Sequence, residues 1–380
     1  MTNFLFKVPP RLFAQDLQKF AGNDTTISRK FPSSLSEISQ STNNRTVDYL
    51  VHTLGFSKDS ALAAAKRIHL KTTANPDSVI ALFKAYGFTL SDTASIFCRN
   101  PNLLLADPDT TLKPKFEFLS RNGFTGHVLV DVISRDPSIL RRSLKKQIVP
   151  CIDILRNFFG STDGVVSLFS ARRGTWVLRN FSESVAPNIE LLRANGVPDS
   201  NIAKIFWVRP RTLARDAEEF SDIVEKTKEA GFNPSSPMFT YGLCTFLGMK
   251  KDKWLSKQHI FTSFGWSEEQ FQSLFLKQPT IMNSSEEQIK RALDFLMNKL
   301  DWTHEEISKY PNVLYLSFEK RVVPRSSILQ HLISKGFIKK TNFGRAFMLS
   351  EDKFLVKFVM QYLSEDPHLL EMYQKEMAVL

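Results

Sequence analysis

The stretch GFTLSDTASIFCRNPNLLLADPDTTLKPKFEFL, residues 87–119, decides the fold of this 380-residue chain. It begins with a glycine and contains three prolines, of which Pro101 and Pro114 lie between segments whose apolar residues suit helices. Proline is tolerated in the first turn of a helix and breaks a helix interior, so it marks helix boundaries. If these prolines recur along the chain at a fixed spacing, they mark the boundaries of a repeated unit.

The pattern recurs with a period near 35 residues. Seven glycines that precede an aromatic or apolar residue, together with Gly160 and Asp301, follow one another from residue 55 to residue 336 at steps of 32, 36, 37, 36, 35, 34, 36 and 35. Two prolines occupy fixed positions within these units. The first is Pro101, Pro137, Pro210 or Pro279; Gly174 takes this position once, and Pro311 lies four residues before it. The second is Pro114, Pro150, Pro187 or Pro324. A fixed period over nearly the whole chain predicts an array of stacked repeats.

Each repeat reads as a helix, a short turn and a second helix. A preferred N-cap residue follows the glycine pair at Ser57, Thr89, Thr125, Ser267 and Thr303, and the last two have a capping-box partner in Gln270 and Glu306. The apolar segment after the first proline suits one 3₁₀ turn, and the second helix ends at the next glycine. We therefore expect an all-α, curving helical-repeat solenoid (superhelix) of about eight or nine helix–3₁₀–helix repeats.

The composition limits the function classes. A net charge of +11 favours an anionic partner, and three widely separated cysteines argue against a disulfide framework or a C-x-x-C metal site. The sequence contains no run of 18 or more apolar residues, so it predicts no membrane span. The chain lacks the common nucleotide-binding and hydrolase motifs, and its histidines have no metal-ligand spacing. We expect no enzyme activity, no catalytic residues, no cofactor, no metal and no membrane partner.

The N-terminal segment differs from the repeats. Residues 1–45 are rich in Ser, Thr and basic residues and contain three acidic ones, Asp16, Asp24 and Glu37. That composition is typical of an organelle transit peptide, and an ordinary disordered tail is the alternative. We predict two regions: a transit peptide or disordered segment over 1–45, and a helical-repeat domain over 46–380.

The repeat motif resembles that of a known family. The segments NPNLLLAD, DPSILRRSLKKQIVP and YPNVLYLSFEKRVVPR are similar to the repeats of the mitochondrial transcription termination factor (mTERF) family in its land-plant form, and SFEKRVVPR, residues 317–325, is the most specific. The resemblance runs from about residue 46 to the last segment. It implies an all-α superhelix, a basic concave groove that holds nucleic acid, and work in mitochondria or chloroplasts.

Basic residues occur at equivalent places in the repeats. Just before the turn proline or its equivalent stand Arg99, Arg135, Arg172, Arg209, Lys277 and Lys309. Stacking would align these cations along one face, where they could follow a phosphate backbone. Alternatively, each cation complements the dipole of the helix that it ends. Both interpretations stay open.

The central repeats hold the largest basic surplus, with 14 Lys and Arg against seven Asp and Glu between residues 130 and 215. We predict nucleic-acid contacts for this cluster and for a smaller one near residue 320, and base stacking for two tryptophans beside arginines. The further candidates are Arg141, Arg142, Lys145, Lys146, Arg173, Arg179, Arg211 and Arg215, then Lys320, Arg321 and Arg325, and for stacking Trp176 and Trp207.

These patterns lead to one functional hypothesis and two rivals. We expect a monomeric, non-catalytic regulator of organellar gene expression, mitochondrial or alternatively chloroplastic, that binds duplex DNA and associates with transcription or splicing machinery. The first rival is a single-stranded-RNA-binding repeat protein of the pentatricopeptide kind, against which the Pro-x-Leu-Leu turns count. The second is a protein-binding scaffold, which would have an apolar or acidic concave face.

Overall fold

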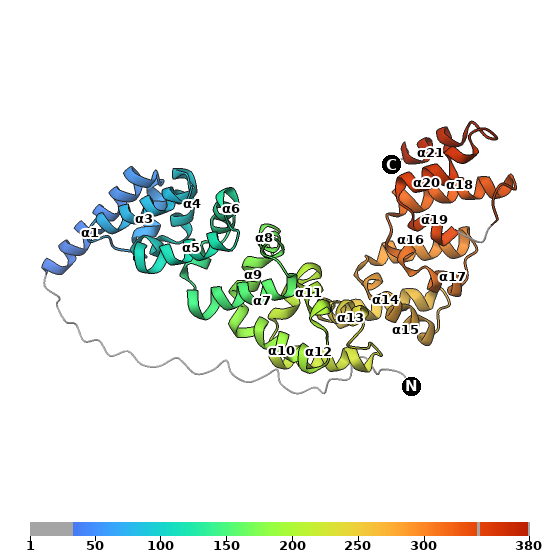
Figure 1. The fold of residues 1–380 in the computed structure, drawn as a ribbon, viewed down its shortest axis with the longest axis horizontal. Helices are drawn as coiled ribbons and strands as arrows, with labels where there is room; N and C mark the ends of the chain where they lie inside the picture. Colours follow the sequence, from blue (N-terminus) through green and yellow to red (C-terminus); the bar gives the residue numbers. More distant parts are fainter. Residues whose placement is uncertain (1–32, 340–342, 379–380) are drawn as a thin grey trace. The chain divides into compact units, whose positions relative to one another are not determined.

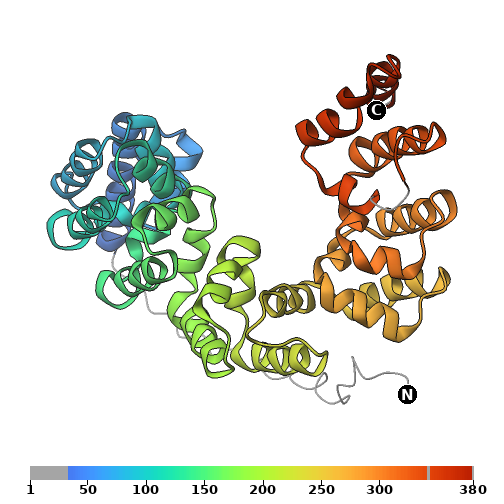
Figure 2. The same cartoon turned by 45° about the vertical axis from the view of Figure 1, so that its right-hand side comes forward.

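The computed structural model describes residues 33–339 and 343–378, and all regular structure in this part of the chain is helical. The described residues form two compact units. Unit 1 contains the described residues up to Ala194 together with Ile202–Glu218, and unit 2 contains Asn195–Asn201 together with the described residues from Glu219. Figures 1 and 2 show both units as stacks of short helices. Most of the predicted transit peptide lies outside the described residues.

Unit 1 contains the repeats before residue 195. Its helices are α1 (Ser33–Leu54), α2 (Lys58–Ala65), α3 (Ala74–Ala85), α4 (Leu90–Arg99), α5 (Lys113–Arg121), α6 (Gly126–Arg135), α7 (Val149–Phe159), α8 (Thr162–Ser170), α9 (Gly174–Arg179), α10 (Ala186–Ala194) and most of α11 (Asp199–Val208). Figure 1 shows these helices in chain order, and short turns described below follow α4 and α6.

Unit 2 contains the later repeats. Its helices are most of α12 (Ala217–Glu229), then α13 (Pro237–Gly248), α14 (Lys251–Ser263), α15 (Glu268–Lys277), α16 (Glu286–Asp294), α17 (His304–Lys309), α18 (Val323–Ser334), α19 (Phe343–Met348), α20 (Glu351–Phe358) and α21 (Leu369–Ala378). None of the described helices in either unit combines the length and the apolar character that crossing a membrane requires.

The predicted repeat boundaries are confirmed. All eight boundary glycines have a positive φ, and Asp301, which takes the place of a ninth, has a φ of 53°. The capping boxes predicted at Ser267 and Thr303 are present. Thr125 occupies the predicted N-cap position of α6, but its side chain accepts no hydrogen bond from the helix. Gly126 follows it with a φ of 53° and diverts the backbone at that point.

The predicted 3₁₀ turns are present after each first proline. They are η1 (Pro101–Leu105), η3 (Pro137–Arg141), η6 (Pro210–Ala214), η7 (Pro279–Asn283) and η9 (Pro311–Tyr315). In η1 the side chains of Leu103 and Leu104 are buried and Leu105 is exposed. The turn η1 packs against α4 of its own repeat and against α3 of the preceding repeat, so it joins consecutive repeats.

In four repeats the second helix begins with a widened, π-helical turn that the sequence analysis did not predict. The turns that precede a proline are η2 (Pro108–Leu112), η4 (Leu144–Ile148), η5 (Phe181–Val185) and η10 (Phe318–Val322). In each of them the residue before the proline donates its N–H to the carbonyl five residues back. Proline has no N–H, and its ring clashes with the carbonyl four residues back in a regular helix. A wider turn removes that clash.

Two repeats depart from the pattern, as their sequences predicted. Where Gly174 replaces the proline, the turn is the α-helical α9 rather than a 3₁₀ turn. A Cβ at residue 174 would lie 2.2 Å from the ring of Phe169, so only glycine fits there. In the repeat that has no Pro-x-Leu-Leu segment, α13 occupies residues 237–248 as one continuous helix.

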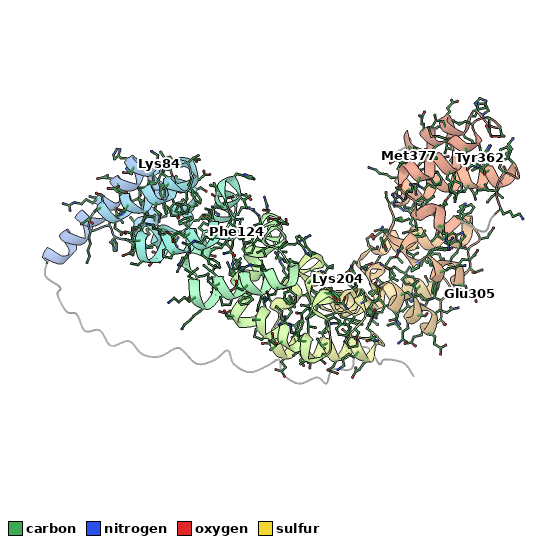
Figure 3. All side chains as sticks on the ribbon, viewed as in Figure 1. Lys84, Phe124, Lys204, Glu305, Tyr362 and Met377 are labelled. Carbon is green, nitrogen blue, oxygen red and sulfur yellow. The ribbon has the colours of Figure 1, made fainter. Side chains whose placement is uncertain are left out.

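The many phenylalanines form the interior of the repeats. Phe83 packs edge-to-face against Phe88, Phe97 and Phe116, at ring-centroid distances of 5.0, 5.1 and 5.2 Å. Phe124, labelled in Figure 3, is also fully buried. Edge-to-face pairs at this spacing contribute about 0.5–1.5 kcal/mol beyond their burial. Flat apolar rings therefore suit the space that the short helices enclose.

Candidate nucleic-acid interface

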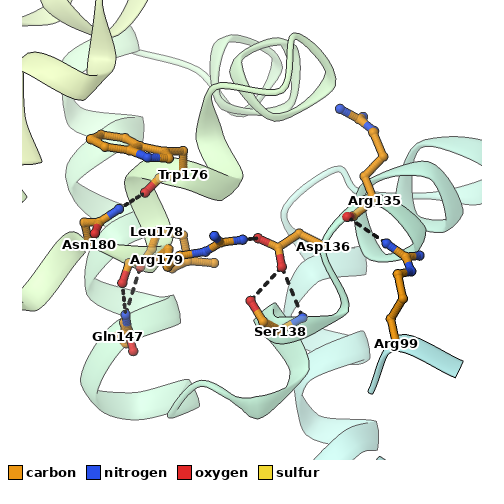
Figure 4. A network of polar contacts seen from close by, with 9 residues as sticks. All are labelled: Arg99, Arg135, Asp136, Ser138, Gln147, Trp176, Leu178, Arg179 and Asn180. Atoms are coloured by element: carbon orange, nitrogen blue, oxygen red, sulfur yellow. Dashed lines mark hydrogen bonds and ion pairs between the residues drawn. The ribbon is translucent and has the colours of Figure 1, made fainter. Parts of the chain in front are cut away.

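Arg99 and Arg135 each bond to the end of a helix in the following repeat. Arg99, in the last turn of α4, donates from Nη1 to the carbonyl of Arg135 at 3.2 Å and from Nη2 to the carbonyl of Ser134 (Figure 4). Arg135 in turn donates to the carbonyls of Phe169 and Ser170 at 3.4 and 3.3 Å. The two guanidinium groups thus satisfy orphan carbonyls at helix C-termini, where a cation also complements the dipole.

Arg179 joins α9 to the preceding repeat. Its Nη2 donates to Oδ2 of Asp136 at 2.6 Å, and Oδ1 of the same carboxylate accepts from the amide and hydroxyl of Ser138 (Figure 4). The Asp136 side chain is 11 % exposed, whereas that of Arg179 is 50 % exposed. Half of the arginine side chain therefore stays open to a second anion.

Five of the predicted arginines line one cleft in unit 1. The cleft has a volume of about 400 Å³ and lies between α9 with its preceding loop and the junction of α11 and η6. We call it the arginine cleft. Its lining residues are Arg172, Arg173, Thr175, Trp176, Arg179, Val208, Arg209, Pro210 and Arg211. No carboxylate lines it, so the cleft suits an anion.

The backbone at the entrance of the arginine cleft has an uncommon conformation. Arg172 has a φ of 64°, which a residue with a Cβ seldom adopts. Arg172 and Arg211 are exposed, and Arg173 is half-buried with its guanidinium carbon 5.9 Å from the ring centre of Trp207. Trp176 and Trp207 are themselves half-buried, so each ring keeps some accessible surface.

The densest basic run of the sequence spans η3 and η4. Arg141, Lys145 and Lys146 are exposed, and Arg142 is half-buried. The side chains of these four residues form no ion pair with the described residues. The run does not line the arginine cleft, but η3 and α9 are in contact, so the two basic groups belong to neighbouring repeats of one unit. Arg215 is exposed just after η6.

The unit 2 candidates have different environments. Lys277 and Lys309 are exposed at the ends of α15 and α17, and Lys320 is exposed in η10 with the half-buried Arg321 next to it. Arg325 is fully buried. The prediction that Arg325 contacts nucleic acid therefore does not fit this structure.

Arg325 has a structural partner set instead. It donates from Nη1 to the carbonyls of Ala346, Phe347 and Leu349 and from Nη2 to Glu351 at 2.9 Å. Its guanidinium carbon also lies 4.6 Å from the ring centre of Phe354. Arg325, the last residue of the motif SFEKRVVPR, thus connects two segments of unit 2.

The same connection recurs through the array, and the sequence analysis missed it. In each of six repeats a side chain in the second helix, or in the turn just before it, donates to a carbonyl of the next turn segment. We call these side chains the repeat connectors. They are Asn75 to Leu104, Lys115 to Leu140, Gln147 to Leu178, Asn188 to Leu213, Lys257 to Met282, and Arg325 to Phe347. For Lys115, Asn188 and Arg325, a polar residue directly after the second proline was the available signal.

Burial of the repeat connectors affects their ionisation. Lys115 and Lys257 are 7 % and 9 % exposed. Desolvation lowers the pKa of both ammonium groups, because a low-polarity environment disfavours the charged form. These lysines therefore belong to the interior and are separate from the basic surface.

Comparison with known proteins agrees with this architecture. The chain belongs to the mTERF family: the family model matches residues 20–171, 80–236 and 166–355. Members of this family are non-catalytic proteins that bind nucleic acid in organelles. A relative, the chloroplastic transcription termination factor MTERF8 of Arabidopsis thaliana, is 19 % identical over 290 residues. That match covers 76 % of this chain and 56 % of the relative, so the chain spans little more than half of the relative's length.

Proposed function

We propose that the chain is an organellar regulator of gene expression that binds the phosphate backbone of duplex DNA through the arginine cleft and the neighbouring basic run. The observation that carries this proposal is the convergence of Arg172, Arg173, Arg179, Arg209 and Arg211 on one cleft without a lining carboxylate. Neutralised phosphates release counterions, so such a surface gives affinity with little sequence information. By occupying its site the protein would block or recruit other machinery.

The basic run supports an interface longer than the cleft. Lys145 and Lys146 lie in η4, and η4 contacts η5, the segment directly after α9. Cations on neighbouring repeats can contact successive phosphates, as the solenoid interpretation of the sequence requires. Arg99 and Arg135 contribute to this interface through the repeat stack that they hold together, because their guanidinium groups bond to carbonyls.

A second candidate target is single-stranded RNA. Trp176 lines the arginine cleft and Trp207 lies beside Arg173, so an unpaired base could stack there while arginines hold its phosphate. The target compartment is an organelle. The sequence favours the mitochondrion, and the chloroplastic name of the relative supports the alternative. A fluorescent-protein fusion to residues 1–45, located by microscopy, would decide between them.

The function is tested by titrating the full chain against duplex DNA and single-stranded RNA of equal length at several salt concentrations. We expect the logarithm of the DNA association constant to fall steeply with the logarithm of salt concentration. Replacing Arg172, Arg173 and Arg211 with Glu should remove most of the affinity and make the slope less steep by about 3, near 1 for each lost phosphate contact.

A matched control separates local contacts from net charge. Lys58, Lys66 and Lys84 are exposed on or next to α2 and α3, and changing all three to Glu alters the charge by the same amount. We expect this variant to keep the salt slope of the wild type. Equal losses in both variants would contradict a local interface. An absence of binding to either nucleic acid at low salt would overturn the proposal and favour a protein-binding scaffold.

A further inference from the structure

The helix α20 has a buried apolar face and an exposed face on which one apolar residue lies among charged ones. Phe354 and Phe358 are buried against unit 2, whereas Val356, between them in sequence, is 60 % exposed. Leu349 lies in the bend just before α20, and Met360 lies in the 3₁₀ turn η12 (Met360–Tyr362) just after it. A surface helix ordinarily has charged and polar residues on the face opposite the core. On the outer face of α20, Val356 departs from this pattern, whereas Asp352, Lys353 and Lys357 follow it.

The exposed apolar residues concentrate at this place. Nine large apolar side chains are exposed among the described residues, and Met348, Val356 and Met360 account for three of them within residues 348–360. The other six are spread over residues 62–315. Single exposed apolar residues are normal, whereas a contiguous group marks a site of interaction.

The outer face of α20 is hollow and has a basic rim. A cavity of about 370 Å³ is lined by Leu349, Asp352, Lys353, Val356 and Lys357. The two lysines are four residues apart, so their ammonium groups lie on the same side of the helix. Their aliphatic stems can line an apolar hollow while the charged ends stay in water. The net charge of the lining is positive, with two lysines against one aspartate.

We propose that this α20 groove binds an amphipathic helix of another protein, with apolar residues that enter the hollow and acidic residues that pair with Lys353 and Lys357. A helix in a groove uses residues spaced by three and four positions, which matches the spacing of the groove. Complementary charges would fix its orientation.

Other occupants fit the groove less well. A second copy of this chain, paired through the same face by two-fold symmetry, would place the lysines of both copies close together. An apolar floor contributes nothing to contacts with phosphates, so nucleic acid is disfavoured. A membrane surface favours a continuous apolar face, whereas Asp352, Lys353 and Lys357 surround Val356 here.

The test uses the full chain and two synthetic peptides of about 18 residues, or five helical turns. Both carry a leucine stripe, and one has glutamates beside the stripe where the other has lysines. We expect the glutamate peptide to bind at least about tenfold more tightly, a difference of about 1.4 kcal/mol. Val356→Asp should abolish that binding. The double variant Lys353→Glu, Lys357→Glu should reverse the preference.

Controls keep the interpretation unambiguous. Leu255→Asp changes an exposed residue on α14 of the same unit and should leave peptide binding unchanged. Val356→Asp should not alter affinity for DNA. A failure of the peptide-binding proposal can therefore be told apart from a failure of the proposed DNA-binding function. If Val356→Asp does not fold, the lysine double variant carries the test.

Three results would overturn the proposal. The first is equal affinity of the wild type for both peptides. The second is a dimer in sedimentation that Val356→Asp converts to a monomer, which would assign the groove to a second copy. The third is binding to vesicles of phosphatidylglycerol and phosphatidylcholine that Val356→Asp abolishes, which would assign it to lipid.

Discussion

Arg179 and Asp136 form an ion pair of 2.6 Å between consecutive repeats, and the same arginine lines the arginine cleft. The carboxylate is mostly buried and the guanidinium is half exposed. One side chain thus takes part both in the repeat stack and in the basic surface, and Asp136 offsets part of the positive charge that a phosphate would meet.

Replacing Asp136 with Asn tests this double role. The amide oxygen can still accept from Ser138, whereas the negative charge beside Arg179 is lost. On the proposed function, duplex DNA should bind about two- to threefold more tightly, and the free energy of unfolding should fall by about 1 kcal/mol or less. Titration and urea unfolding measure the two effects. Weaker binding by a folded variant would show that Asp136 positions Arg179 for contact.

Arg99→Ala separates the two interpretations of the cations that precede the turns. The side chain bonds to carbonyls of the next repeat, so its loss should lower the free energy of unfolding by about 1 kcal/mol. The salt dependence of DNA binding should stay unchanged, whereas Arg211→Ala should change the salt slope and leave stability unchanged. A flatter salt slope for Arg99→Ala would show that this arginine contacts phosphate as well.

Lys115 tests the repeat connectors. Lys115→Gln keeps a donor for the Leu140 carbonyl and removes the cost of a buried charge, so stability at neutral pH should be equal or higher. Lys115→Leu removes the donor and should cost about 1–3 kcal/mol. Chemical unfolding of both variants gives the comparison. Equal stability of the leucine and glutamine variants would mean that the hydrogen bond contributes nothing measurable.

Glu351 gives unit 2 a pH dependence. Burial acts to raise the pKa of its carboxyl, but hydrogen bonds from Tyr373 and Arg325 outweigh this and hold the pKa below its usual 4.5. A carboxyl whose pKa is lower in the folded state than in the unfolded state stabilises the fold at pH values above its unfolded-state pKa. That stabilisation is lost as the pH falls through the folded-state pKa. Unfolding followed from pH 7 downward should show a smaller loss of stability below about pH 4.5 in Glu351→Gln than in the wild type. Identical profiles would contradict this role.

The sequence allowed the repeat boundaries to be predicted because glycine and proline constrain the backbone locally. Gly87, Thr89 and Pro101 act through their own dihedral angles and nearest neighbours, so one repeat already contains the signal. The widened turn before Pro114 also has a local cause, because the proline ring excludes a regular helical turn there.

The environment of the basic residues could not be predicted in the same way. Arg325 directly follows Pro324, and Arg211 directly follows Pro210. Arg325 is nevertheless fully buried, whereas Arg211 is exposed. The difference comes from segments far away in sequence, since Arg325 bonds to residues 346–351. Convergence on the arginine cleft likewise depends on the contact of α9 with η6, which no single repeat contains.

The repeat connectors give the array a polarity. Every connector donates forward, from an earlier repeat to a later one, as Asn75 does to Leu104 and Lys257 does to Met282. A shortened protein that begins at a later repeat would have carbonyls without their donors, and one that stops at an earlier repeat would have donors without their carbonyls. Buried ammonium groups tolerate that loss far less than carbonyls that water can reach. Repeats should therefore be easier to remove from the front of the array than from its back.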